Sequence, residues 1–233
     1  MKICGLQKTT LIDYPGRIAC TIFLYGCNFR CPFCYNADLV TKKAQGIFSE
    51  ENILKFLKDR QNTLDGVCIT GGEPLLTIKK DFLKKIKEMG YAIKIDTNGT
   101  NPQKLSELIQ ENLIDAVAMD IKGAKEDYDL ITGSQVSIGK IEESIKIVSK
   151  LDNYEFRTTI LKEFHSPEKI QSISEWLTSL TESNPKKYFL QGFKGKGDFI
   201  NKKYEKYQET TENYLIRLKE LIEKDFEEVK IRW

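Results

Sequence analysis

Short apolar runs alternate with longer segments of helical periodicity along most of the chain. The short runs are rich in β-branched and aromatic residues and predict strands at 17–25, 66–70, 91–96, 115–121, 155–161 and 187–191. The longer segments repeat apolar residues three and four apart and predict helices at 49–57, 82–90, 105–109, 141–148, 166–177 and 215–222. This alternation is typical of βα units around a mostly parallel sheet.

About six such units are followed by a predicted terminal strand at 226–233, and no linker composition interrupts them. We therefore expect a single α/β domain over 1–233, with an N-terminal extension at 1–16, a βα core at 17–191 and a C-terminal helix and strand at 192–233. Periodicity alone leaves two arrangements open, an incomplete α/β barrel and a doubly wound sheet.

Composition narrows the function classes only slightly. The 36 Lys and Arg against 34 Asp and Glu give a net charge of +2, which provides no electrostatic reason to expect a nucleic-acid or membrane partner. No apolar run approaches the roughly 18 residues of a membrane span, and the first residues lack the apolar core of a signal peptide. The expected location is the cytoplasm.

Three of the six cysteines, Cys27, Cys31 and Cys34, fall within eight residues, directly after the strand that ends at Tyr25. In a parallel α/β fold this is the carboxyl end of a strand, where ligands bind. Because cytoplasmic thiols stay reduced, the cluster predicts a metal site rather than a set of disulfides.

The number of ligands separates the candidate metals. A structural zinc takes four ligands, commonly as two CxxC pairs, and only one CxxC occurs here. An iron–sulfur cluster held by three thiolates would keep one iron open to a substrate or cofactor. A zinc-binding interaction protein with Cys68 as fourth ligand remains the alternative, although Cys4, Cys20 and Cys68 lack ligand spacing and are expected to be small buried hydrophobes.

The spacing Cys27-x3-Cys31-x2-Cys34, with Phe33 just before the third cysteine, resembles the cluster motif of the radical S-adenosylmethionine (SAM) superfamily. The resemblance implies a [4Fe–4S] cluster on these cysteines and SAM on the fourth iron, with Phe33 and Tyr35 among the residues around them.

Gly71-Gly72-Glu73-Pro74 resembles the GGEP segment of the same superfamily. The resemblance implies that this backbone and Glu73 hold the methionine amino group of SAM. The residue types suit that task, because paired glycines allow a close approach of the backbone and a carboxylate accepts from an ammonium. A plain turn between strand and helix is the alternative.

Asp96-Thr97-Asn98-Gly99 and Asp120-Ile121-Lys122 resemble segments of the glycyl-radical-enzyme activating proteins. The resemblance implies that Asp96 and Asp120 approach the SAM carboxylate through a monovalent cation, that Lys122 contacts SAM, and that Asn98 belongs to the SAM site. A shared cation would offset the repulsion between the two carboxylates. The alternatives are a helix-initiating turn for the first segment and a surface ion pair for the second.

Residues 5–16, together with 23–28 and 34–36, resemble the activating proteins of anaerobic ribonucleoside-triphosphate reductase. Members of that family often carry His at the position of Tyr35, so no histidine role is transferred to it. His165 precedes a predicted helix cap and is expected at the surface or in the cap. Arg157 lies within a predicted strand and needs an anionic partner, either SAM or a structural carboxylate.

The resemblance implies a radical SAM oxidoreductase, and with it an incomplete (β/α)6-type barrel as the fold. Flavodoxin or ferredoxin would supply an electron to the cluster, and SAM would be cleaved to methionine and a 5′-deoxyadenosyl radical that abstracts hydrogen from a glycine of the reductase. The expected function is thus activation of an anaerobic ribonucleotide reductase. The alternatives are another glycyl radical enzyme and a small-molecule substrate for the same chemistry.

Overall fold

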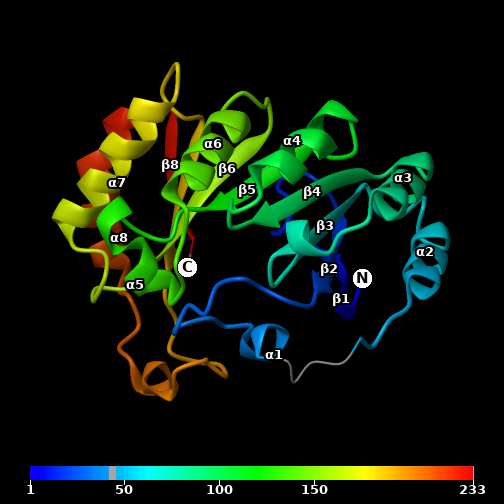
Figure 1. The fold of residues 1–233 in the computed structure, drawn as a ribbon, viewed down its shortest axis with the longest axis horizontal. Helices are drawn as coiled ribbons and strands as arrows, with labels where there is room; N and C mark the ends of the chain where they lie inside the picture. Colours follow the sequence, from blue (N-terminus) through cyan, green and yellow to red (C-terminus); the bar gives the residue numbers. More distant parts are fainter. Residues whose placement is uncertain (42–45, 233) are drawn as a thin grey trace. The chain divides into compact units, whose positions relative to one another are not determined.

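The computed structural model describes residues 1–41 and 46–232 (Figure 1). Their packing divides the chain into two compact units, each built from separate segments. The first unit comprises Met1–Asn28, Asn36–Thr97 and Gln103–Val117, and the second comprises Phe29–Tyr35, Asn98–Pro102 and Ala118–Trp233. The single-domain organisation stays a prediction.

Four of the described strands lie wholly in the first unit: β1 (Ile3–Thr10), β2 (Ala19–Leu24), β3 (Gly66–Gly71) and β4 (Ala92–Thr97). β2, β3 and β4 are parallel, and β1 runs antiparallel to β2. The helices are α1 (Ala37–Val40), α2 (Glu50–Lys58), α3 (Lys80–Glu88) and most of α4 (Pro102–Gln110), with a short 3₁₀ turn at Pro74–Leu76.

The segment 1–16, expected as an N-terminal extension, contains the strand β1, which the apolar pattern did not predict. Its sequence ICGLQKTT carries no apolar run, because this strand pairs along its length with β2, meets Phe48 only through a bridge at Ile3, and leaves its central residues exposed or half-buried. A half-exposed antiparallel strand needs fewer apolar residues than the buried parallel strand β2, which the apolar pattern predicted correctly.

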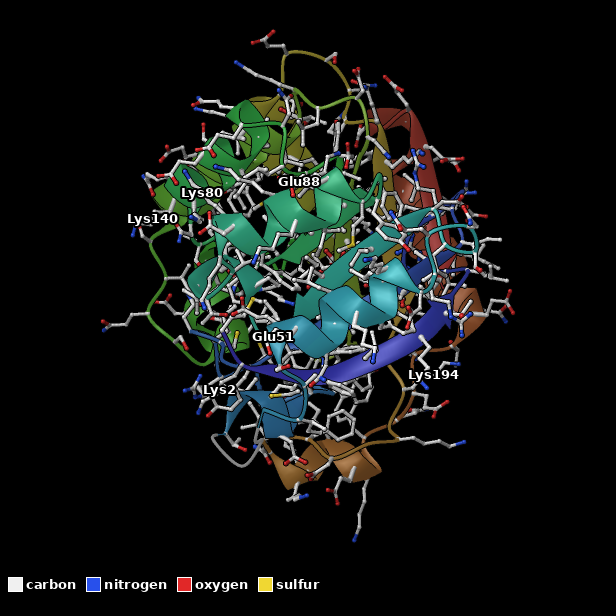
Figure 2. The ribbon with its side chains drawn as sticks, turned by 90° about the vertical axis from the view of Figure 1, so that its right-hand side faces the viewer. Lys2, Glu51, Lys80, Glu88, Lys140 and Lys194 are labelled. Carbon is white, nitrogen blue, oxygen red and sulfur yellow. The ribbon has the colours of Figure 1, made fainter. Side chains whose placement is uncertain are left out.

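Local sequence explains why the helices of this unit begin and face as they do. Ser49 caps α2 in a capping box, accepting from the backbone N–H of Asn52 while Asn52 accepts from the N–H of Ser49. Figure 2 shows Glu51 on α2 and Lys80 and Glu88 on α3, on the outer sides of amphipathic helices. Their apolar residues are buried, among them Ile53, Leu57, Phe82, Leu83 and Ile86.

The second unit contains strands β6 (Tyr154–Ile160), β7 (Lys187–Gly192) and β8 (Glu228–Arg232), which are parallel. Its helices are α5 (Tyr128–Thr132), α6 (Ile138–Val148), α7 (Pro167–Leu180) and α8 (Glu212–Ile222), with 3₁₀ turns at Lys125–Asp127, Lys202–Lys206 and Glu223–Asp225. Ser166 caps α7 as predicted, accepting from the N–H of Lys169. The predicted terminal strand is confirmed as β8, and Trp233 lies outside the described residues.

Strand order decides between the two arrangements that periodicity left open. β5 (Ala116–Asp120) has residues in both units, and hydrogen-bonded neighbours follow chain order from β1 to β8. A doubly wound sheet reverses its strand order, whereas consecutive parallel strands are the order of an α/β barrel. β1 and β8 remain the edges among the described strands, so the barrel-type sheet is not closed.

Among the described helices, α7 is the longest, with 14 residues. None of these helices is long and apolar enough to cross a bilayer.

A tyrosine fills the start of the sheet in the first unit. Ala19, Gly66 and Ala92 lie in one register row at the beginnings of β2, β3 and β4. The ring of Tyr14 packs there with Ala19, Ala92 and Ala116, and a Cβ on Gly66 would lie 3.0 Å from that ring. Small residues at these strand starts therefore make room for one large side chain, whose buried hydroxyl has no hydrogen-bond partner among the described residues.

We predict that Tyr14→Phe leaves the free energy of unfolding unchanged or raises it by about 1 kcal/mol, because it removes an unsatisfied buried hydroxyl. Tyr14→Ala should lower it by about 3–5 kcal/mol by leaving a cavity. Urea unfolding followed by circular dichroism measures both variants. A Tyr14→Phe variant as unstable as Tyr14→Ala would contradict this assignment.

Candidate active site

In the first unit, the loop after β3 is bound to the loop after β2. The N–H of Gly72 donates to the Leu24 oxygen at 2.9 Å, and the N–H of Glu73 donates to the Gly26 oxygen at 2.7 Å. Gly71 has φ +118°, and a Cβ on Gly71 or Gly72 would overlap the backbone of Leu24 or Gly26. Only glycine permits this contact, which holds the predicted GGEP segment beside the residue preceding Cys27.

The carboxylate of Glu73 is buried where β3 and β4 end, with 1% of the residue exposed. Its Oε1 accepts from the N–H of Leu75 at 3.1 Å and from the hydroxyl of Thr97 at 2.8 Å. Pro74 begins the 3₁₀ turn that supplies the Leu75 N–H. These contacts hold the carboxylate in one orientation, and Thr97 is a supporting residue whose role the sequence did not reveal.

Asp96, at the same end of β4, lies beside a buried cation. Its Oδ1 is 3.4 Å from Nζ of Lys94 and accepts a hydrogen bond from the Cys68 thiol at 3.7 Å. Cys68 and Cys20 are fully buried, which confirms the prediction for both, and burial raises the pKa of Cys20 to about 12. The prediction is wrong for Cys4, which is only half-buried because it lies on the partly exposed strand β1.

In the second unit, Cys31 and Cys34 lie in one turn, in which the N–H of Cys34 donates to the Cys31 oxygen at 3.0 Å. Cys31 is buried and Cys34 half-buried. The N–H of Asn201 donates to the Pro32 oxygen at 2.9 Å, so the segment after β7 holds this turn by its backbone.

Aromatic side chains add to that attachment. The Phe33 ring packs against Phe164 and Tyr204, with centroids 5.9 and 6.0 Å away. Tyr35 stacks on Phe193 at 5.8 Å, and its hydroxyl accepts from the N–H of Lys194 at 2.6 Å. Both predicted residues therefore fasten the cysteine turn to the C-terminal part of the unit, a structural task that the sequence motif did not indicate.

Asp120, at the end of β5, is held between two cations. Its Oδ2 is 2.9 Å from Nζ of Lys122, and its Oδ1 accepts from Nε of Arg157 at 2.9 Å. Burial by itself raises the pKa of Asp120, but the charges of Arg157 and Lys122 outweigh it and lower this pKa to about 2. Arg157 thus has a carboxylate partner on the protein.

The row of charges continues across the unit. Nη1 of Arg157 is 3.8 Å from Oε1 of Glu155, whose carboxylate accepts two bonds from Arg232 on β8, at 2.9 and 2.8 Å. Glu155 and Arg232 escaped the sequence prediction because they lie far from any motif. The alternating charges leave Arg157 fixed from both sides.

Lys122 is positioned through its backbone as well as its side chain. Its N–H donates to the Tyr128 hydroxyl at 3.2 Å, and its oxygen lies 3.0 Å from Nε2 of His165. Burial lowers the pKa of the Lys122 ammonium, but the charges of Asp120, Cys31 and Cys34 outweigh this effect and raise the pKa above its usual value.

The prediction of His165 as a surface or capping residue is wrong, because the residue is fully buried. Its Nδ1 accepts from the N–H of Leu161 at 3.1 Å, which leaves Nε2–H to donate to the Lys122 oxygen. Both ring nitrogens are satisfied in the neutral form. No sequence pattern indicates this arrangement, since both partners are backbone atoms and one of them, the Lys122 oxygen, lies 43 residues away along the chain.

Asn98 is buried, and its Oδ1 accepts from the N–H and hydroxyl of Thr100 at 3.1 and 2.7 Å. These two bonds form a local turn before α4, which is the alternative considered for this segment.

Residues 21–177 match the radical SAM superfamily. A protein of Methanocaldococcus jannaschii with the provisional name glycyl-radical enzyme activating enzyme is 34% identical, over 99% of this chain and 95% of the relative. The chain belongs to the glycyl-radical activating family of radical SAM enzymes. The pyruvate formate-lyase-activating enzyme of Listeria monocytogenes is 32% identical over 52% of this chain and 53% of its own length.

Solved structures show the same radical SAM fold. A domain of the pyruvate-formate lyase-activating enzyme from Bacteroides vulgatus has a TM-score of 0.57 at 20% identity and covers 72% of this chain and 99% of that domain. Streptococcus suis SuiB bound to precursor peptide SuiA has a TM-score of 0.68 at 15% identity, over 91% of this chain and 47% of SuiB.

This family membership sets aside the zinc-binding alternative. Within the described residues of either unit, no group of three or more His, Cys, Asp or Glu side chains gathers around a point that could hold a single metal ion. A [4Fe–4S] cluster makes no such demand, because each thiolate binds a different iron. The radical SAM family implies this cluster and SAM. The thiols of Cys31 and Cys34, whose charges act on Lys122, suit the cluster, and the oriented carboxylate of Glu73 suits SAM.

The implied monovalent cation fits less well. Asp96 in the first unit lies beside Lys94, and Asp120 in the second is paired with Lys122 and Arg157. Each carboxylate already has a cationic side chain of its own unit, so its charge is offset without a metal ion.

We predict that the buried His165 makes this protein sensitive to mild acid. Burial lowers its pKa from 6.5 to about 4. The unfolded chain therefore takes up a proton near pH 6.5 while the folded chain resists until about pH 4, and stability present above pH 6.5 is lost as the pH falls between these values. The loss should reach about 3 kcal/mol.

Urea unfolding of the apoprotein at pH 7, 5.5 and 4.5, compared with His165→Gln, measures this loss. The wild type should lose more stability on acidification than the variant. Parallel pH dependences of the two proteins would show that His165 does not titrate as assigned.

Proposed function

We propose that Cys27, Cys31 and Cys34 hold a [4Fe–4S] cluster, that SAM binds beside it, and that the chain installs a glycyl radical on an anaerobic ribonucleotide reductase. The observation that supports the proposal most strongly is the buried carboxylate of Glu73, fixed by Leu75 and Thr97 on a loop bonded to the loop that leads to Cys27. When bound, the cluster and SAM supply a 5′-deoxyadenosyl radical that abstracts hydrogen.

The chain's own residues have the tasks of binding, orienting and excluding water. Glu73 offers an acceptor for the SAM ammonium, and the backbone of Gly71 and Gly72 brings that acceptor close to the cysteine loop. The Lys122 ammonium, fixed by Asp120, offers a cation for the carboxylate of SAM. The buried ring of Phe33, packed against Phe164, keeps water away from its side of the cysteine turn.

The target is supported less directly. The resemblance of residues 5–16 to activators of ribonucleotide reductase favours that enzyme. Those residues, however, also form β1 and place Tyr14 in the sheet, tasks that need no particular target. The similarity to pyruvate formate-lyase-activating enzymes favours another glycyl radical enzyme as the second candidate. We further propose flavodoxin or ferredoxin as electron donor and a cytoplasmic location, which suits six cysteines that form no disulfide.

Electron paramagnetic resonance distinguishes the targets. The reconstituted protein, dithionite and SAM are incubated with the anaerobic ribonucleotide reductase of the same organism or with its pyruvate formate-lyase. A glycyl radical doublet on the reductase alone supports the first target, and a doublet on the lyase alone supports the second. No doublet on either protein, together with continued SAM cleavage, would contradict both.

Cys31→Ala should abolish cluster binding, whereas Cys20→Ala should retain it, because Cys20 is a buried core residue without a ligand role. After anaerobic reconstitution we expect about four irons per wild-type chain and 5′-deoxyadenosine after dithionite and SAM are added. Retention of iron and of SAM cleavage by Cys31→Ala would show that the ligands lie elsewhere.

Glu73→Gln should weaken SAM binding about ten- to hundredfold, since replacing a charged acceptor costs about 1.5–3 kcal/mol. Isothermal titration of the reconstituted protein measures the affinity. Glu88→Gln, at the exposed end of α3, is the matched control and should bind SAM like the wild type. Equal affinities of Glu73→Gln and Glu88→Gln would remove Glu73 from the site.

A further inference from the structure

Lys94 is a buried lysine on β4, with 2% of the residue exposed, and no motif assigns it a role. Its register partner on β3 is Cys68, which is in turn paired with Thr21 on β2. The three residues therefore form one row of the sheet, two register positions beyond the row at which Tyr14 packs. A lysine in such a row is costly to bury unless its ammonium is paired.

The ammonium of Lys94 has oxygen partners on two segments of the first unit. It donates to the main-chain oxygen of Asp13 at 2.6 Å and lies 3.4 Å from Oδ1 of Asp96. The side chain of Asp13 is itself held, because its carboxylate accepts from the Thr21 hydroxyl at 2.5 Å. The ammonium of Lys94 is thus held between the main-chain oxygen of Asp13, before β2, and the carboxylate of Asp96, at the end of β4.

An ammonium and a monovalent metal ion carry the same charge, and both are satisfied by oxygen atoms such as those of Asp13 and Asp96. Lys94 therefore supplies what a sodium or potassium ion would supply to Asp96. In the second unit, the carboxylate of Asp120 likewise forms ion pairs with Lys122 and Arg157. Neither carboxylate lacks a cation.

We propose that Lys94 takes the place of a monovalent cation at Asp96, and that SAM binding by this protein is independent of sodium and potassium. Lys94 is a positioning residue, which acts by neutralising and orienting Asp96. The inference rests on the proposed SAM-binding function and adds the ionic requirement of that site.

The test is the dissociation constant of SAM for the anaerobically reconstituted protein, measured by isothermal titration at one ionic strength in potassium chloride, sodium chloride or tetramethylammonium chloride. Tetramethylammonium is too large to enter a cation site. For the wild type we expect constants that agree within about twofold in the three salts.

Lys94→Met should create a cation requirement. Its affinity in tetramethylammonium chloride should be at least about tenfold weaker than that of the wild type and should recover in potassium chloride, because the small ion can then reach Asp96. Lys79→Met, which removes an exposed lysine paired with Glu50, should bind SAM like the wild type in every salt.

A wild type that loses about tenfold or more of its affinity without potassium or sodium would overturn the inference, whatever the variant does. A folded Lys94→Met protein with wild-type affinity in all three salts would overturn it too. Absence of SAM binding by the wild type in any salt is a different result, which would contradict the proposed function itself. If Lys94→Met does not fold, the affinities of the wild type in the three salts still decide whether SAM binding needs a monovalent metal ion.

Discussion

The contact on which the site depends is the close approach of two backbones at Gly71 and Gly72. The loops after β2 and β3 share two hydrogen bonds there, and the space between them admits no Cβ. The constraint fixes Glu73 relative to the loop that leads to Cys27, and Thr97 extends it to the end of β4. In the proposed function, this backbone geometry presents the Glu73 carboxylate to the amino group of SAM.

Within each unit, charged groups of opposite sign alternate in a row. In the first, the Asp13 oxygen, Lys94 and Asp96 follow one another. In the second, Arg232, Glu155, Arg157, Asp120 and Lys122 alternate in sign. A partly buried charge is costly unless a group of opposite charge lies beside it. The rows therefore determine which side chains stay charged and fixed in position when a ligand binds. The rows also explain why Asp120 stays ionised and why neither carboxylate requires a metal ion.

The sequence predicted what local chemistry determines and missed what depends on distant partners. Apolar runs located the parallel strands, and the hydroxyls of Ser49 and Ser166 located two helix starts, because these signals lie within a few residues. Spacing of the cysteines identified the radical SAM family. β1 went unrecognised because an exposed strand has no apolar run. The buried setting of His165 and the role of Lys94 depend on backbone atoms far away along the chain, which no local pattern encodes.

Electron paramagnetic resonance of the reduced, reconstituted protein tests whether SAM binds an open iron of a three-cysteine cluster. We expect a [4Fe–4S]⁺ signal whose g values shift when SAM is added, because the ligand enters the coordination of one iron. A cluster signal that SAM leaves unchanged, under conditions in which the cluster is intact, would contradict this expectation.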